Sequence, residues 1–226
     1  RISDDAKSGI LLEVNCETDF VSKNENFQGF VASLADSLIA SQPADHAAAT
    51  QAQFNGLTVE DAVKAKVAEV GENLQFRKYV RFEVQGEGVV ASYIHMGGRV
   101  GVLIEVGAGN AETASTAGFR ELVKDLTLHI AAAAPRGLSR EDIPAEVVEA
   151  EKSIFRVQLA DSGKPANIIE NIINGKIGKF FSESCFLEQG FVKDPDTTIS
   201  KLLEAKGKEL GDTLTVRRFV RFGLGE

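Results

Sequence analysis

The sequence has few of the residues from which metal sites and disulfide scaffolds are built. Its 226 residues include no Trp, one Met, two Cys and three His. Cys16 and Cys185 are far apart, and no Cys-x-x-Cys, His-x-x-x-His or carboxylate-histidine cluster has the spacing of metal ligands. We therefore expect no structural metal, and so few cysteines fit a reducing compartment.

Long apolar runs are also lacking, and none approaches the roughly 18 residues that span a bilayer. We expect a soluble intracellular protein that binds no membrane, located in a bacterial cytoplasm or in the matrix or stroma of an organelle. The chain opens at Arg1 with neither an initiator Met nor an apolar signal segment. This start is typical of a fragment or a processed form.

Positive charge is in deficit, with 25 Lys and Arg against 33 Asp and Glu, a net charge of -8 and a pI near 5.1. Such a chain repels phosphate backbones, so we expect no direct nucleic-acid partner. Two basic clusters alternate with apolar residues and read as the solvent face of half-buried strands. They are Arg77, Lys78, Arg81 and Arg217, Arg218, Arg221.

The chain contains two weak copies of one unit. At an offset of 92, the run Gly9–Val14 matches Gly101–Val106, and four apolar helix positions from Phe27 to Leu38 match Phe119 to Ile130. At an offset of 140, Thr58 to Gly71 matches Thr198 to Gly211, and Arg77–Phe82 matches Arg217–Phe222. Each copy is expected to run strand, helix, helix, strand.

Local signals support these elements. Ser22 and Glu25 form a candidate capping box before the first helix, and Thr58 and Asp61 form one before the second. Gly71 can end that second helix in the left-handed conformation. The second copy has an extra strand, since 89–95 and 100–106 read as a hairpin joined through Met96 to Arg99.

The two offsets differ by 140 minus 92, which is 48 residues, so the second copy carries an insertion. Two apolar helix stripes separated by Ser162–Pro165 predict an antiparallel helical hairpin at about 142–185. The fold class is therefore α+β: two related subdomains, each a small antiparallel sheet packed with helices, plus the hairpin. We expect an N-terminal subdomain at 1–85 and a C-terminal subdomain at 86–226.

Motifs for cofactors and catalysis are weak. The run from Gly86 resembles a dinucleotide fingerprint but leads into a strand, the run from Gly107 lacks the third glycine, and no P-loop is present. No cofactor is expected. The enzyme alternative is a cysteine hydrolase, with Cys16 as nucleophile and His46, His95 or His129 as base. His46 lies in an alanine-rich loop, His129 suits a core position, and His95 ends a strand where it is exposed.

The two copies disagree most between first strand and first helix. Phe20 falls opposite Glu112 and Asp19 opposite Ala111, and no large hydrophobic residue occurs from 107 to 118. If Phe20 filled the core of its unit, the second copy should hold an apolar residue there. Phe20 is therefore a candidate exposed aromatic at a loop tip, typical of a protein-binding hot spot. The alternative is that Phe20 lies under its own helix and Asp19 caps a turn.

The run Leu12–Val21, with letters L-E-V-N-C-E-T-D-F-V, closely resembles the signature of the elongation factor Ts family. Ser92–Leu103 resembles its second signature, Ser162–Pro165 its hairpin turn, and Arg221 with Phe222 its last strand. The resemblance covers essentially the whole chain. It implies two related subdomains with an inserted antiparallel coiled coil. The family's usual N-terminal three-helix module is not found before Arg1, and its helix after the last strand is expected to be cut off at Glu226.

The resemblance also implies a function. The partner would be elongation factor Tu, bound to GDP or free of nucleotide, in a complex of unknown stoichiometry that could include a homodimer or a 2:2 assembly. The protein would release GDP without making or breaking bonds, so it would not be an enzyme. The partner-binding residues would be Thr18, Asp19, Phe20, Val21, His95, Met96, Gly97, Gly98 and Arg99.

Overall fold

A computed structural model describes residues 1–160 and 162–226. The chain forms two compact units, one of Arg1–Thr127 with Val216–Glu226 and one of Leu128–Thr215. Both contain helices and short strands, so the α+β class is confirmed. These units divide the chain differently from the sequence repeat, and the expected subdomain boundary between residues 85 and 86 stays a prediction.

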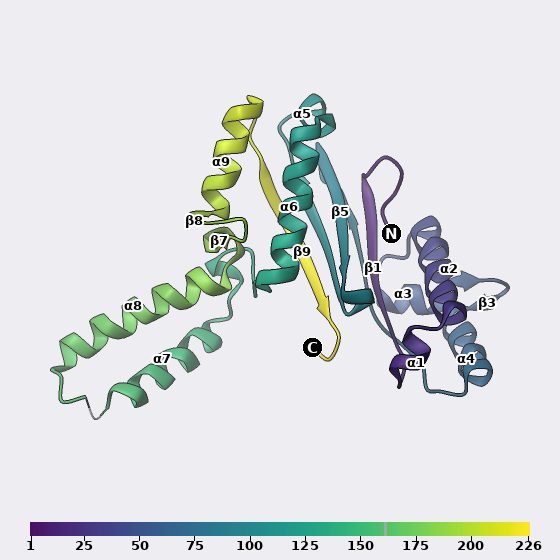
Figure 1. Ribbon diagram of the computed structural model, residues 1–226, viewed down its shortest axis with the longest axis horizontal. Coiled ribbons are helices and arrows are strands. Elements are labelled where there is room, and N and C mark those ends of the chain that lie inside the picture. Colours follow the sequence, from purple (N-terminus) through teal and green to yellow (C-terminus); the bar gives the residue numbers. More distant parts are fainter. Residues whose placement is uncertain (161) are drawn as a thin grey trace. The chain divides into compact units, whose positions relative to one another are not determined.

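The first copy builds a two-stranded sheet covered by helices. Strand β1 (Ser8–Asn15) pairs antiparallel with β4 (Gln75–Glu83). Helices α2 (Glu25–Ser41) and α4 (Val59–Val70) supply much of the core that includes Ile10 and Tyr79. The remaining elements are α1 (Asp19–Ser22), α3 (His46–Gln51), β2 (Gln53–Phe54) and β3 (Leu57–Thr58). Figure 1 labels α1 to α4 near β1.

The second copy contributes a three-stranded sheet to the same unit. Strand β5 (Gly88–His95) pairs antiparallel with β6 (Val100–Gly107), and the strand order is β5-β6-β9, with β9 at Thr215–Gly223. The predicted hairpin is thereby confirmed, and a short 3-10 turn, η1 (Met96–Gly98), joins its strands. Helices α5 (Ala111–Ser115) and α6 (Ala117–Ala133) follow β6.

The two sheets meet through reciprocal contacts that obey the repeat. A Cβ on Gly9 would lie 3.2 Å from Leu103, and a Cβ on Gly101 would lie 2.8 Å from Leu11. Both leucines are buried. Glycine thus stands where each strand receives the leucine of the other copy, because a side chain there would separate the sheets. The match of Gly9 with Gly101 is a packing requirement of both copies.

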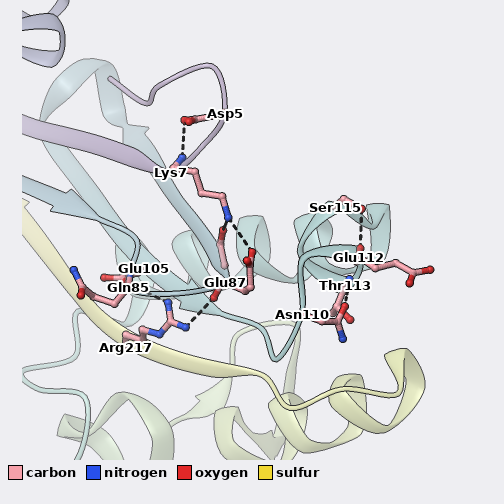
Figure 2. A network of polar contacts seen from close by, with 11 residues as sticks. Asp5, Lys7, Gln85, Glu87, Glu105, Asn110, Glu112, Thr113, Ser115 and Arg217 are labelled. Carbon is pink, nitrogen blue, oxygen red and sulfur yellow. Dashed lines mark hydrogen bonds and ion pairs between the residues drawn. The ribbon is translucent and has the colours of Figure 1, made fainter.

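A buried carboxylate also repeats. Glu105 is fully buried and pairs with Arg217 at 3.1 Å and with Arg218 at 2.7 Å. Figure 2 shows Arg217 beside Glu105 and Gln85. Burial alone would raise the pKa of Glu105, but hydrogen bonds from the Gln85 N–H and both guanidinium groups outweigh it and lower that pKa.

The matching carboxylate of the first copy is Glu13, which pairs with Arg77 at 2.9 Å and Lys78 at 3.2 Å. Here too burial opposes ionisation, and the hydrogen bonds of Arg77 and Lys78 lower the pKa below its usual value. The basic clusters were predicted on the solvent face of half-buried strands, but four of their side chains form ion pairs with a carboxylate of the neighbouring strand: Arg77, Lys78, Arg217 and Arg218. The other two, Arg81 and Arg221, pair with Glu83 and Glu226.

The second unit holds the inserted hairpin. Helices α7 (Ala145–Leu159) and α8 (Ala166–Ser184) lie side by side in Figure 1. Arg156 pairs with Glu170 at 3.6 Å, and Lys176 lies 4.9 Å from the Phe155 ring centroid. The antiparallel hairpin is confirmed, although Asp161, within the predicted range, lies outside the described residues. The unit also contains η2 (Arg140–Asp142), η3 (Phe186–Glu188), β7 (Gly190–Phe191), β8 (Asp194–Thr198) and α9 (Ile199–Leu210).

Helix caps confirm part of the local analysis. The hydroxyl of Thr58 accepts from the N–H of Asp61, and Thr198 caps α9 in the same way. Gly71 and Gly211 end their helices with φ of 79° and 66°. These are the left-handed values that favour glycine, because a Cβ would meet the neighbouring carbonyl oxygen.

The predicted cap of α2 and the predicted loop around His46 were wrong. The cap of α2 is Asn24, whose side chain accepts from the N–H groups of Asn26 and Phe27, whereas Ser22 is the last residue of α1. A short helix therefore uses the residue that was expected to cap the next one. His46 begins helix α3 instead of lying in a loop, with its Nε2 3.0 Å from the Phe76 carbonyl and its ring stacked on Phe76.

Candidate functional site

The T-D-F-V segment forms one helical turn, α1, where an irregular loop was expected. Strand β1 ends at Asn15, and the Thr18 hydroxyl accepts from the N–H of Val21 to cap the turn. Asp19 occupies the first turn, where a negative charge is favourable beside the free N–H groups of a helix. This cap fixes the backbone on both sides of Phe20.

Phe20 is exposed over 88% of its surface, which is the largest value among the exposed large hydrophobic residues of the described chain. Its neighbour Val21 is half-buried and packs on the core of the first sheet. The turn therefore anchors itself through Val21 and presents Phe20 to solvent. The alternative, in which Phe20 lies under its own helix, is wrong.

A carboxylate that the sequence analysis missed holds this turn in place. Glu72 Oε2 accepts from the N–H of Glu17 at 3.2 Å and from the N–H of Thr18 at 3.0 Å. Its other oxygen accepts from the Thr18 hydroxyl. The sequence signal that could have identified Glu72 is its position directly after Gly71, the glycine that ends α4 in a left-handed conformation.

The second predicted segment meets the first through an ion pair. Arg99 lies 80 residues beyond Asp19, and its Nη2 is 3.2 Å from both carboxylate oxygens. Arg99 follows a turn in which Met96, Gly97 and Gly98 all have positive φ, at 51°, 65° and 96°. Such a conformation is uncommon for methionine and strained, and strain of this kind is often found at functional sites.

His95 and Met96 are exposed at the end of the β5–β6 hairpin. His95 Nδ1 lies 2.9 Å from the Tyr93 hydroxyl, and the two rings are stacked with centroids 5.6 Å apart. Tyr93 therefore orients the imidazole. We define the Phe20 surface as Asp19, Phe20, His95, Met96 and Arg99, two exposed segments joined by the Asp19–Arg99 ion pair.

Val21 and Thr18 support this surface from behind, Val21 by packing and Thr18 by capping. Gly97 and Gly98 supply the backbone of the turn, with no heavy atom within 4 Å of an added Cβ. All nine residues predicted from the resemblance thus lie in α1 and its cap or in the turn that contacts it. Their role in binding a partner stays a prediction.

The alternative of a cysteine hydrolase loses support at Cys16. Burial and the nearby Glu72 raise the pKa of this thiol, and its Sγ lies 3.4 Å from the Thr18 carbonyl oxygen. A nucleophilic cysteine requires the opposite shift. Each candidate base is engaged elsewhere: His46 with Phe76, His95 with Tyr93, and buried His129 with Gln189. The core position expected for His129 is confirmed.

Two other kinds of site are not found among the described residues. Across residues 1–160 and 162–226, no three His, Cys, Asp or Glu side chains are grouped so that they could hold a metal ion. Within that same part of the chain, no helix combines the length and the apolar character that crossing a membrane requires.

The second copy carries a turn of the same construction. Asn110 stands 92 positions after Thr18 and caps α5 by accepting from the N–H of Thr113, which stands 92 positions after Val21. Figure 2 shows this cap, with the exposed Glu112 pointing away from the helix. The predicted alignment of Phe20 with Glu112 is therefore confirmed. The scaffold is shared and the exposed residue differs.

Comparison with known proteins gives a consistent match. The family described as Elongation factor TS matches residues 17–226. The elongation factor Ts of Trichlorobacter lovleyi is 42% identical over 228 residues, covering 100% of this chain and 73% of that protein. Those of Syntrophotalea carbinolica and Clostridium botulinum (strain Alaska E43) are 46% and 43% identical, covering 96% and 100% of this chain and 71% and 73% of their own lengths.

These matches define an elongation factor of protein biosynthesis. The chain belongs to the elongation factor Ts family. This membership supports a nucleotide-exchange role toward elongation factor Tu.

Proposed function

We propose that this protein binds elongation factor Tu in its GDP form and speeds the release of GDP by inserting Phe20 into an apolar pocket of the partner's nucleotide domain. The exposure of Phe20 on a capped and clamped turn carries the proposal. A large aromatic side chain that is held in place and desolvated only on binding is a typical interface hot spot.

Insertion of Phe20 would displace helices of the partner and disturb the site that holds Mg2+ and the β-phosphate of GDP. Charge-assisted contacts to that phosphate hold the nucleotide, so a small displacement weakens it strongly. Burial of one Phe supplies roughly 1.5–3 kcal/mol, which is too little for a very large acceleration. His95, Met96 and Arg99 would hold the complex in its strained form.

No bond is made or broken on this chain, so the protein acts as an exchange factor and not as an enzyme. Linkage then gives the cycle, because a factor that weakens nucleotide binding is itself bound more weakly when nucleotide is present. GTP would therefore displace the factor from the nucleotide-free complex. The residues of the Phe20 surface all belong to one chain, so the proposal applies to a 1:1 and to a 2:2 complex.

The direct test is stopped-flow release of fluorescent GDP from elongation factor Tu after mixing with this protein. We expect the release rate to rise with protein concentration and to saturate. A rate that stays at the unassisted value across the concentration range would contradict the proposed function.

A further inference from the structure

We infer that Glu72 is a positioning residue for Phe20, and that its carboxylate clamp determines how fast the bound partner loses nucleotide. The inference rests on the proposed function. Glu72 does not belong to the Phe20 surface; it is half-buried behind that surface and bonds to residues that precede Phe20.

The clamp acts through the cap of α1. The Thr18 hydroxyl donates its hydrogen to Glu72 and accepts from the N–H of Val21. A hydroxyl rotates to suit its partners, so donation to Glu72 points a lone pair at the helix. Linked bonds of this kind strengthen one another. Glu72 therefore orients the cap as well as holding the backbone N–H groups of Glu17 and Thr18.

Glu72 is itself fixed to the core. It directly follows Gly71, whose N–H donates to the Val67 carbonyl as α4 ends. Helix α4 is anchored by buried Val59, Ala62 and Val63. Glu72 thus connects α1 to a packed helix. This connection also fixes the position of Phe20, whose side chain has almost no packing contacts of its own.

Apart from the packing of Val21, the other restraints on the turn are weak. Helix α1 has four residues and none of them is buried, and a helix of that length has no stability in isolation. The Asp19–Arg99 ion pair joins two exposed side chains, and pairs of this kind contribute little. Without Glu72 the turn would have to become ordered while Phe20 enters the partner, which raises the barrier to GDP release.

The test is Glu72→Gln, which keeps the side chain's size but leaves one acceptor oxygen where the clamp uses two. We expect the maximal rate of GDP release to fall about tenfold, equivalent to about 1.4 kcal/mol. The half-saturating concentration should change little, because the exposed residues are intact. Glu72→Asp keeps both acceptor oxygens on a shorter side chain. Its maximal rate should lie between those of the parent and Glu72→Gln.

The repeat offers a matched control in Asp212, which follows Gly211 and stands 140 positions after Glu72. Asp212→Asn changes the matching carboxyl group of the second copy, whose α5 turn exposes Glu112 and not Phe. This variant should leave the maximal rate of GDP release unchanged. In a Phe20→Ala background, Glu72→Gln should have no further effect, since it acts through Phe20. A purely structural role would reduce the rate in both backgrounds.

The outcomes separate the two claims. If the unmodified protein does not speed GDP release, the proposed function is wrong. If it does, and Glu72→Gln releases GDP at the same maximal rate or shows its full effect without Phe20, the positioning role of Glu72 is wrong while the proposed function stands.

Discussion

The turns α1 and α5 share the same construction but expose different residues. Each follows the matched strand of its copy, β1 or β6, and is capped by a polar side chain that accepts from an N–H three residues later. One exposes Phe20 and the other exposes Glu112. Since the fold is built equally well over either residue, folding does not require an aromatic residue at this position. The comparison therefore supports the proposed role of Phe20 in partner binding.

The residues before the two matched strands, β1 and β6, also differ. Lys7 stands 92 positions before Arg99, and Ala6 has a φ of 57° where Gly98 has 96°. Arg99 contacts Asp19, whereas Lys7 contacts Glu87 at 3.2 Å, as Figure 2 shows. The α5 turn exposes Glu112, whereas α1 and the turn before Arg99 expose Phe20 and Met96. Both copies contribute residues to the Phe20 surface, and the α5 turn provides an internal control for the α1 turn.

The largest expected effect follows from placing the α5 residue in α1. Phe20→Glu should reduce the rate of GDP release at least about a hundredfold, because a carboxylate would enter an apolar pocket without a partner. The melting temperature should change little, since exposed substitutions usually cost within about 0.5 kcal/mol. Stopped-flow release and thermal melting on one sample measure both. A variant that melts far below the parent would instead place Phe20 in the core.

The carboxylates Glu105 and Glu13 extend the comparison of the two copies to stability, because each copy uses one in an ion pair. Glu105→Gln should cost about 2 kcal/mol of unfolding free energy, below the ~3–5 kcal/mol typical of fully buried pairs, since its arginine partners are partly exposed. Glu13→Gln should cost less, because Glu13 is 10% exposed where Glu105 is fully buried. Denaturant unfolding at neutral pH gives both values.

The same groups set an acid limit on stability. Their pKa values are lowered on folding, so their contribution is present above the unfolded value of 4.5 and is lost as pH falls through the lower folded value. We expect unfolding free energy to decline below pH 4.5, and to decline less steeply in the two Gln variants. Parallel profiles for all three proteins would show that these pairs do not set the limit.

A smaller effect is expected at His95. His95→Ala should slow GDP release about fivefold to tenfold and leave folding intact, since the side chain is exposed and contributes contact area, not core packing. Tyr93→Phe keeps the stacked ring and removes only the hydroxyl bonded to Nδ1, so its effect should be smaller. Equal rates for His95→Ala and the parent would remove His95 from the Phe20 surface.

Much of this architecture could be predicted because its signals are local or repeated. The Thr58 cap, the Gly71 terminus and the β5–β6 hairpin each depend on a few neighbouring residues. The alignment of Phe20 with Glu112 came from the repeat, which holds for the structure as well.

Other features could not be predicted, because they depend on residues brought together from distant parts of the chain. The Glu72 clamp spans 54 and 55 positions, and the Asp19–Arg99 pair spans 80. The short helices α1 and α5 were missed because four or five residues carry no periodicity. That omission also led to Ser22 being assigned as the cap of α2.

The central claim is that the position of the aromatic residue on α1, and not merely its presence on the protein, drives GDP release. The most direct test is the exchanged pair Phe20→Glu with Glu112→Phe, which has the same composition as the parent. Its melting temperature should stay close to that of the parent, and stopped-flow measurement should find GDP leaving elongation factor Tu at the unassisted rate. Release at the parent's rate by this folded variant would contradict the account.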